Sequence, residues 1–175
     1  RAVNGVDRPN VSRSQNILYF GSVPDVEALN EFVGKIHGTD FKVHYAGSSS
    51  VRHIEDLSSN FVFHGFLTDI EVKELMAKCN FGLCVGKPGS HSEMVISSKF
   101  VDYLKNGIIP IVPASMAEMF SIINEFSVGL SEADFCANVS SGWQGMEAEC
   151  ARLRKSMGVY NSQRLLNQFD RLLGT

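Results

Sequence analysis

Residues 97–112 read SSKFVDYLKNGIIPIV, and this stretch decides the fold class. Its two serines are typical of a helix start, Gly107 is typical of a helix end, and residues 108–112 form the apolar run of a buried strand. A helix that passes through a glycine into a fully apolar strand is typical of a parallel sheet covered by helices. The backbone N–H groups at such a helix start, together with the helix dipole, also suit a phosphate group.

Lys99 and Asp102 follow the two serines and indicate a ligand larger than phosphate. Lys99 adds a full positive charge. Asp102 lies one helical turn further on, hence on the same face of the helix, where its carboxylate can accept hydrogen bonds from a ribose diol. Diphosphate and ribose together are the shared part of nucleotide sugars. The alternative is a capped amphipathic helix whose Lys99 and Asp102 are only solvated, and the local sequence leaves both interpretations open.

The rest of the chain repeats this alternation of short apolar strands and helices. Strands are predicted at residues 16–20, 41–46, 61–63, 81–85, 108–112 and 128–130. Helices are predicted at residues 26–37, 70–79, 116–126, 147–157 and 162–173, in addition to the helix that begins at Ser97. Asp69 is the predicted N-cap of the helix at 70–79. We therefore expect an α/β fold with a Rossmann-like, doubly wound parallel sheet, helices on both faces and further helices at the C-terminus.

In such sheets, ligands bind outside the carboxyl ends of the strands. Three of the predicted strands end at a glycine, which lets a ligand approach the backbone closely. The predicted ligand edge comprises Gly21, Ser22, Gly47, Ser48, Gly65, Phe66 and the loop at residues 87–98. The chain carries neither a G-x-G-x-x-G nor a P-loop fingerprint, which disfavours NAD enzymes and P-loop NTPases.

Composition narrows the class of partner and the compartment. The 175 residues include 16 Lys and Arg against 19 Asp and Glu, so the basic excess of a nucleic-acid-binding protein is missing. No apolar run approaches the roughly 18 residues of a membrane span, and no signal-peptide pattern opens the sequence. The four cysteines show no C-x-x-C spacing, so we expect core thiols in a reducing cytoplasm and no metal site. Trp143, the only tryptophan, is expected to anchor the terminal helices to the core.

Six segments, in order, resemble the C-terminal, donor-binding domain of retaining glycosyltransferases of the GT-B fold, glycosyl transferases group 1 type. They are VNGVD at residues 3–7, ILYFG at 17–21, VHYAG at 43–47, NFVFHGFL at 60–67, SKFVDYL at 98–104 and YNSQ at 160–163. The resemblance covers nearly the whole chain. It implies an interdomain linker at residues 1–15, a Rossmann-like nucleotide-sugar-binding domain at 16–140, and C-terminal helices at 141–175 that pack on this domain or cross from it.

The resemblance implies the donor half of an enzyme that moves a sugar from a UDP-, GDP- or ADP-sugar to a polysaccharide or glycolipid acceptor, without a cofactor. It implies a catalytic contact between Glu93 and the donor sugar. The implied nucleotide-sugar-binding residues are Gly21, Ser22, Gly47, Gly65, Phe66, Lys87, His91, Ser97, Ser98, Lys99 and Asp102. We expect the acceptor-binding N-terminal domain to be missing from this chain. The parent protein is expected in the cytoplasm, with peripheral association at the inner face of the membrane left open.

Two departures from the family pattern keep alternatives open. Residues 22–25 read SVPD, where the family carries basic residues that neutralise the diphosphate. Met94 stands where the family has its first acid, and Glu93 is one place out of register. A degenerate, non-catalytic scaffold of the same fold is therefore one alternative. A nucleotide-sugar epimerase with Glu93 and His91 as its acid–base groups is the other.

Overall fold

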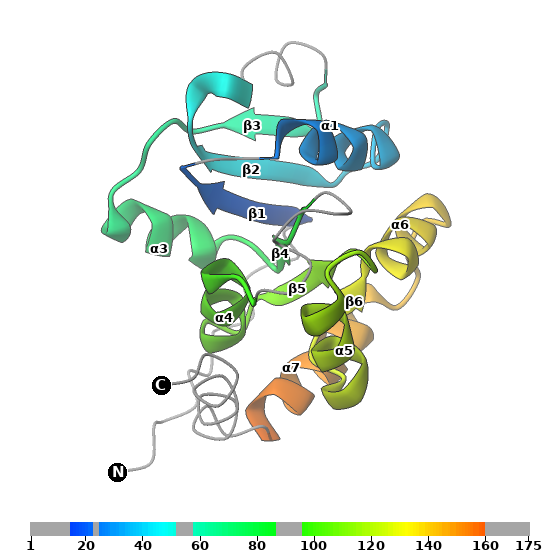
Figure 1. Ribbon diagram of the computed structural model, residues 1–175. Helices are drawn as coiled ribbons and strands as arrows, with labels where there is room; N and C mark the ends of the chain where they lie inside the picture. The colour runs from blue at the N-terminus through cyan, green and yellow to red at the C-terminus, as the bar shows by residue number, and fades with distance from the viewer. Residues whose placement is uncertain (1–14, 23–24, 52–57, 87–95, 160–175) are drawn as a thin grey trace.

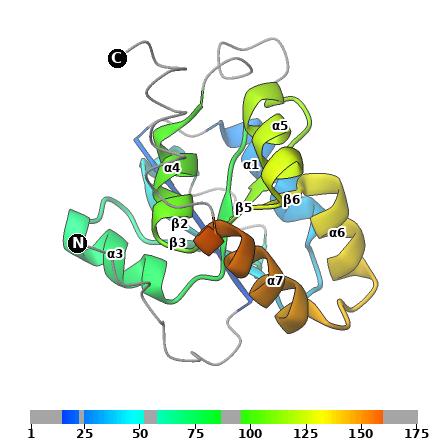
Figure 2. The same cartoon turned by 90° about the horizontal axis from the view of Figure 1, so that it is seen from below.

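The computed structural model describes residues 15–22, 25–51, 58–86 and 96–159, and it holds one six-stranded parallel sheet with helices around it (Figures 1 and 2). The strands are β1 (Asn16–Gly21), β2 (Lys42–Gly47), β3 (Phe61–Phe63), β4 (Phe81–Leu83), β5 (Ile109–Val112) and β6 (Leu130–Ser131). Their order across the sheet is β3-β2-β1-β4-β5-β6. This confirms the predicted Rossmann-like, doubly wound α/β fold. The direction of chain progression reverses between β1 and β4, which makes this the topological switch point of the sheet.

The helices cover both faces of the sheet. They are α1 (Val26–Lys35), the short 3₁₀ turn η1 (Ser49–Val51), α3 (Asp69–Ala77), α4 (Ser98–Lys105), α5 (Ala117–Phe126), α6 (Glu132–Ser140) and α7 (Met146–Val159). Helices α1 and α6 share one face, where Phe32 and Phe135 stack with ring centroids 6.0 Å apart. In the described part of the chain, no helix combines the length and the apolar character needed to cross a bilayer.

Helix α4 packs on the sheet through Tyr103, whose side chain is fully buried. A Cβ placed on Gly82 of β4 would lie only 2.5 Å from atoms of the Tyr103 ring, so the ring lies flush against the strand. The Tyr103 hydroxyl donates to the carbonyl oxygen of Leu18 in β1 at 3.0 Å and lies 3.3 Å from that of Leu83 in β4. One side chain thus fixes α4 to both strands that flank the switch point.

Strand β3 has its predicted bounds, and the other predicted elements in the described ranges begin or end one or two residues from their predicted positions. Two predictions need correction. Asp69 is not the N-cap of α3, because Thr68 holds that position and its hydroxyl accepts from the Glu71 N–H. Helix α6 was not predicted at all. It begins after Ser131, which caps it, and only Phe135 and Val139 of its nine residues are buried. The predicted helix at 162–173 and the predicted linker at 1–15, apart from residue 15, lie outside the described residues.

Two other expectations are confirmed in part, as far as the described residues go. The Trp143 ring packs against the rings of Phe41, Phe81 and Phe135, at centroid distances of 6.1, 5.6 and 5.4 Å. It therefore ties the segment between α6 and α7 to the core. Among the four cysteines, which are all free thiols, Cys79, Cys84 and Cys150 are buried and Cys136 is half-buried.

Candidate functional site

The carboxyl ends of β1 and β4 are neighbours at the switch point, where open α/β sheets bind their ligands. The two strands pair over only two positions, Ile17 with Phe81 and Leu18 with Gly82. Strand β1 continues beyond this short ladder to Gly21. Helix α4 begins on the chain segment that follows β4. The site is therefore built from a strand end and a helix start that are distant in sequence.

The start of α4 is formed as predicted from its serines. Ser97 is the N-cap, and its hydroxyl accepts from the Phe100 N–H at 3.2 Å. Ser98, the first helical residue, is exposed, and the first turn holds no acidic residue. The first turn of a helix has N–H groups without intrahelical acceptors and carries the positive end of the helix dipole. This helix start can therefore accept an anion.

Lys99 extends from this helix start over the end of β1. A Cβ placed on Gly21 would lie 2.8 Å from Lys99 Cε and 3.2 Å from Lys99 Nζ, so the lysine fills the space beside the glycine. The ammonium also lies 5.5 Å from the centroid of the Tyr19 ring, in cation–π range. Burial lowers the pKa of Lys99, and the nearby Cys84 opposes this shift in part. A partly desolvated cation therefore lies at the switch point.

The three predicted strand-exit glycines meet at the same edge of the sheet. Gly21 and Gly47 are partners in the β1–β2 register, and the Gly47 N–H donates to the Gly65 carbonyl at 2.8 Å. The Tyr45 hydroxyl donates to the Gly21 carbonyl at 2.8 Å and accepts from the Ser48 N–H at 3.0 Å. Tyr45 thus holds the ends of β1 and β2 together. Sequence reasoning did not single out this tyrosine.

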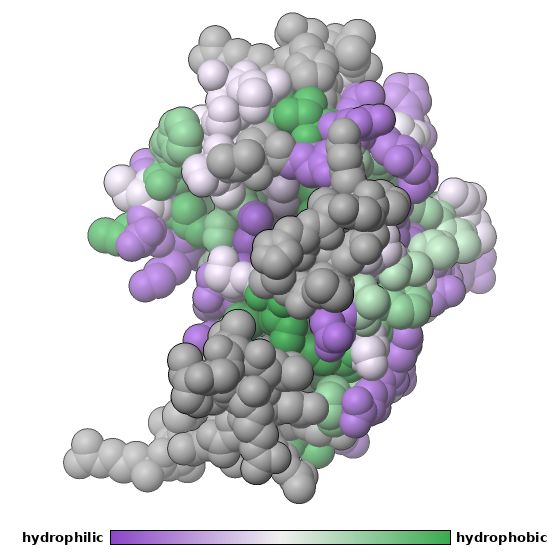
Figure 3. Space-filling model, in the orientation of Figure 1, coloured by the Kyte–Doolittle hydropathy of each residue, from purple (hydrophilic) through white to green (hydrophobic). Residues whose placement is uncertain are grey.

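Phe66 follows Gly65 and is 75% exposed, and Ile70 at the start of α3 is 71% exposed. Figure 3 shows hydrophobic surface over the start of α3. Phe66, which belongs to the predicted ligand edge, is therefore a candidate for contact with a flat apolar group, such as a nucleobase.

The structure brings together part of the predicted site. Gly21, Gly47 and Gly65 form one connected row, with Lys99 against its first member and Ser97 and Ser98 at the helix start that carries it. Ser22 is exposed directly after β1. Asp102 is half-buried on α4, and its carbonyl accepts from the Asn106 side chain at 2.8 Å. Glu93, Lys87 and His91 lie outside the described residues.

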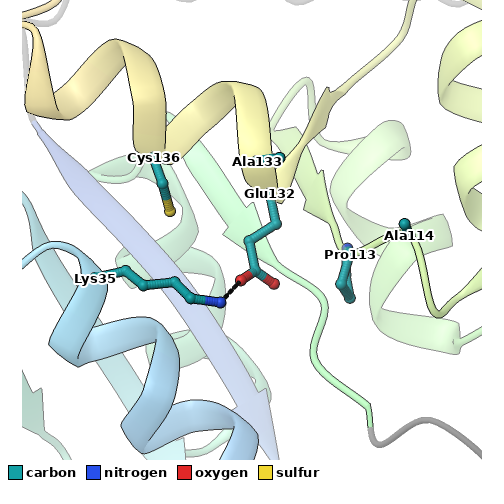
Figure 4. Close-up of a pocket in the computed structure, with 6 residues that line it drawn as sticks. All are labelled: Lys35, Pro113, Ala114, Glu132, Ala133 and Cys136. Carbon is teal, nitrogen blue, oxygen red and sulfur yellow. Dashed lines mark hydrogen bonds and ion pairs between the residues drawn. The ribbon is translucent and has the colours of Figure 1, made fainter.

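A cavity of about 340 Å³ lies elsewhere, between α1, the segment after β5 and α6 (Figure 4). Across it, Lys35 Nζ donates to Glu132 Oε1 at 2.7 Å, and the same ammonium pairs with Glu31 at 2.8 Å. These two bonds raise the pKa of Lys35. The cavity contains none of the predicted site residues. Its ion pair links α1 to α6.

No protein-family model matches the chain, and no curated protein matches it. The described ranges also hold no group of three or more His, Cys, Asp or Glu residues that could bind a metal ion. A fold of this kind hosts many activities, so the function has to be inferred from the site.

Proposed function

We propose that this domain binds the nucleotide diphosphate of a sugar donor at the carboxyl edge of β1 and β4, as the donor half of a retaining GT-B glycosyltransferase. The acceptor would be a polysaccharide or glycolipid. The observation that carries the proposal is the position of Lys99. This lysine lies at the start of α4, and its ammonium lies beside Gly21 at the end of β1. The sequence resemblance at residues 98–104 supports it.

Lys99 supplies the charge that residues 22–25 lack. Sugar transfer requires a diphosphate leaving group to be stabilised, and fixed positive groups aimed at that charge do this without reorganisation. Here the positive end of the α4 dipole and the Lys99 ammonium act from the same helix turn. Because Lys99 is partly desolvated, its attraction for a bound anion is less screened than that of a surface lysine.

The remaining parts of the donor have their own contacts in the proposal. Asp102 accepts hydrogen bonds from the ribose diol one helical turn after Lys99. The nucleobase lies against the backbone of Gly65 and the exposed ring of Phe66. Glu93 contacts the donor sugar and stabilises the oxocarbenium-like centre.

A thermal-shift screen tests the proposal. The ligands are UDP, GDP, ADP and CMP and the common nucleotide sugars that contain them. Each is added separately to the wild-type chain and to the Lys99→Met variant. A ligand at 100 times its Kd should stabilise the wild type by about 2.7 kcal/mol. We expect stabilisation by one nucleoside diphosphate family and a smaller effect in the variant. Stabilisation by none would favour the non-catalytic scaffold. Conversion of a nucleotide sugar to its epimer would favour the epimerase.

A further inference from the structure

His44 and His64 form a side-chain pair between β2 and the residue that follows β3. His44 Nδ1 lies 2.9 Å from His64 Nε2, and the two rings are within 23° of parallel. His44 lies on β2, and His64 directly follows β3 and precedes Gly65. Residue Phe66, whose ring is exposed at the ligand edge, is therefore two positions from this contact.

The Nε2 atom of His44 is buried and has no hydrogen-bond partner in the described part of the chain. In the neutral pair, His44 Nδ1–H can donate to His64, and the buried Nε2 then carries only a lone pair. Adding one more proton to this neutral pair changes the hydrogen bonding. If either ring becomes an imidazolium while the 2.9 Å bond is kept, the buried Nε2 must carry an N–H that has no acceptor. The other arrangement places two N–H groups face to face and breaks the bond.

The surroundings also oppose protonation. Within the described ranges, the groups that act on His44 are Lys42 on β2, Lys78 at the end of α3 and His64 after β3, and all three are basic side chains. Burial, followed by these neighbours, lowers the pKa of His44 from 6.5 to about 4. The folded pair therefore excludes a proton that the same ring would accept in water at mildly acidic pH.

The backbone that this pair secures is short. Strand β3 has only three residues and lies at the edge of the sheet. Beyond it, the His64 N–H donates to the Tyr45 carbonyl at 2.9 Å, and the Gly47 N–H donates to the Gly65 carbonyl at 2.8 Å. A short edge strand is the kind of element that opens locally. The histidine pair adds a side-chain bond at this weak position.

We propose that the His44–His64 contact is an acid-released latch that holds the exit of β3, residues 64–66, against β2. At neutral pH the unprotonated pair keeps the exit closed. Below about pH 6 the open state gains a proton that the closed state excludes, so the exit opens more often. Any effect of this opening on donor affinity rests on the proposed function, because Gly65 and Phe66 are the proposed nucleobase contacts.

The size of the effect follows from linkage. A ring that titrates at 6.5 when open and at about 4 when closed makes the opening equilibrium about twentyfold larger at pH 5 than at pH 7. Hydrogen exchange of the Gly47 and His64 amides, corrected for the intrinsic pH dependence of exchange, reports this opening directly. We expect about a twentyfold loss of protection in the wild-type chain without nucleotide.

Two variants make the test specific. His44→Gln removes the titrating ring, and we expect protection of the two amides to become nearly independent of pH between 7 and 5. His37→Gln, which replaces an exposed histidine outside the pair, should keep the wild-type response. A change below threefold in the wild type, or an unchanged response in His44→Gln, overturns the proposal. Since the experiment contains no nucleotide, failure of the latch and failure of the proposed function are separate results.

Discussion

The side chain of Lys99 occupies the space that any side chain at Gly21 would need. A Cβ on Gly21 would lie 2.8 Å from Lys99 Cε, closer than two such carbons approach, and Gly21 has a φ of 151°. The absence of a side chain at the end of β1 therefore allows a cation from α4 to lie at the switch point. This pairing of a strand-end glycine with a helix-start lysine is the centre of the proposed site.

Gly21→Ala should displace Lys99 from this position. The added methyl group pushes the flexible lysine toward water, so we expect the pKa of Lys99 to rise toward its ordinary value as desolvation is relieved. The unfavourable φ should also cost about 1–3 kcal/mol of stability. Nuclear magnetic resonance of the Lys99 Cε group measures the pKa, and urea unfolding measures the stability. Gly38→Ala is the matched control, because Gly38 also has a positive φ but no atom near its added Cβ. An unchanged Lys99 pKa in Gly21→Ala would contradict the packing described.

Lys99→Met should weaken binding of a nucleoside diphosphate more than binding of the free nucleoside. We expect a loss of about 1.5–3 kcal/mol for the diphosphate, the range for hydrogen bonds to charged groups. The loss should shrink as salt rises, because added ions screen the charge. Isothermal titration calorimetry at two salt concentrations measures both effects. Lys105→Met, an exposed lysine at the other end of α4, is the control. Equal losses for diphosphate and nucleoside would rule out a phosphate contact.

Asp102→Asn tests the ribose contact. If the carboxylate holds the diol, the variant should bind the nucleoside diphosphate about 1.5–3 kcal/mol more weakly, with stability changed by no more than about 0.5 kcal/mol. A 2′,3′-dideoxy nucleotide should bind equally weakly to wild type and variant, since both complexes lack the same contact. A variant that melts while keeping its nucleotide affinity would make Asp102 a structural helix residue.

The histidine pair also predicts how global stability depends on pH. The folded-state pKa of His44 is lowered from 6.5 to about 4, so its contribution is fully present above pH 6.5 and is lost as pH falls toward 4. The difference in unfolding free energy between wild type and His44→Gln should therefore shift against the wild type between pH 7 and pH 4.5. Urea denaturation at several pH values measures it. A difference that stays constant over this range would show that His44 titrates normally.

The sequence predicted what depends on local patterns. The serine cap at Ser97 and the stop at Gly107 bound α4, and the apolar runs gave the strands, because caps and periodicity act over a few residues. The N-cap of α3 was placed one residue late, although Thr68 and Glu71 have the spacing of a capping box and were the better signal. Helix α6 was missed because its nine residues include only two buried apolar side chains.

Contacts between distant elements could not be predicted in this way. The meeting of Lys99 with Gly21 depends on the angle at which α4 packs on β1 and β4. The His44–His64 pair depends on the register of β2 and β3 and on the path of the chain after β3. Neither contact follows from a local sequence motif. Local sequence patterns assign no role to either histidine, and their pairing appears once the sheet is assembled.

Mapping of the bound nucleotide tests the central claim most directly. Amide shifts of the wild-type chain are followed by nuclear magnetic resonance while UDP, GDP or ADP is added. The proposed site predicts that the largest shifts cluster at Gly21, Gly47, Gly65 to Phe66 and residues 97–102, with a dissociation constant that rises in Lys99→Met. Shifts that cluster instead around the cavity between Lys35 and Glu132, or saturable binding that is unchanged in Lys99→Met, would contradict a donor site at the switch point.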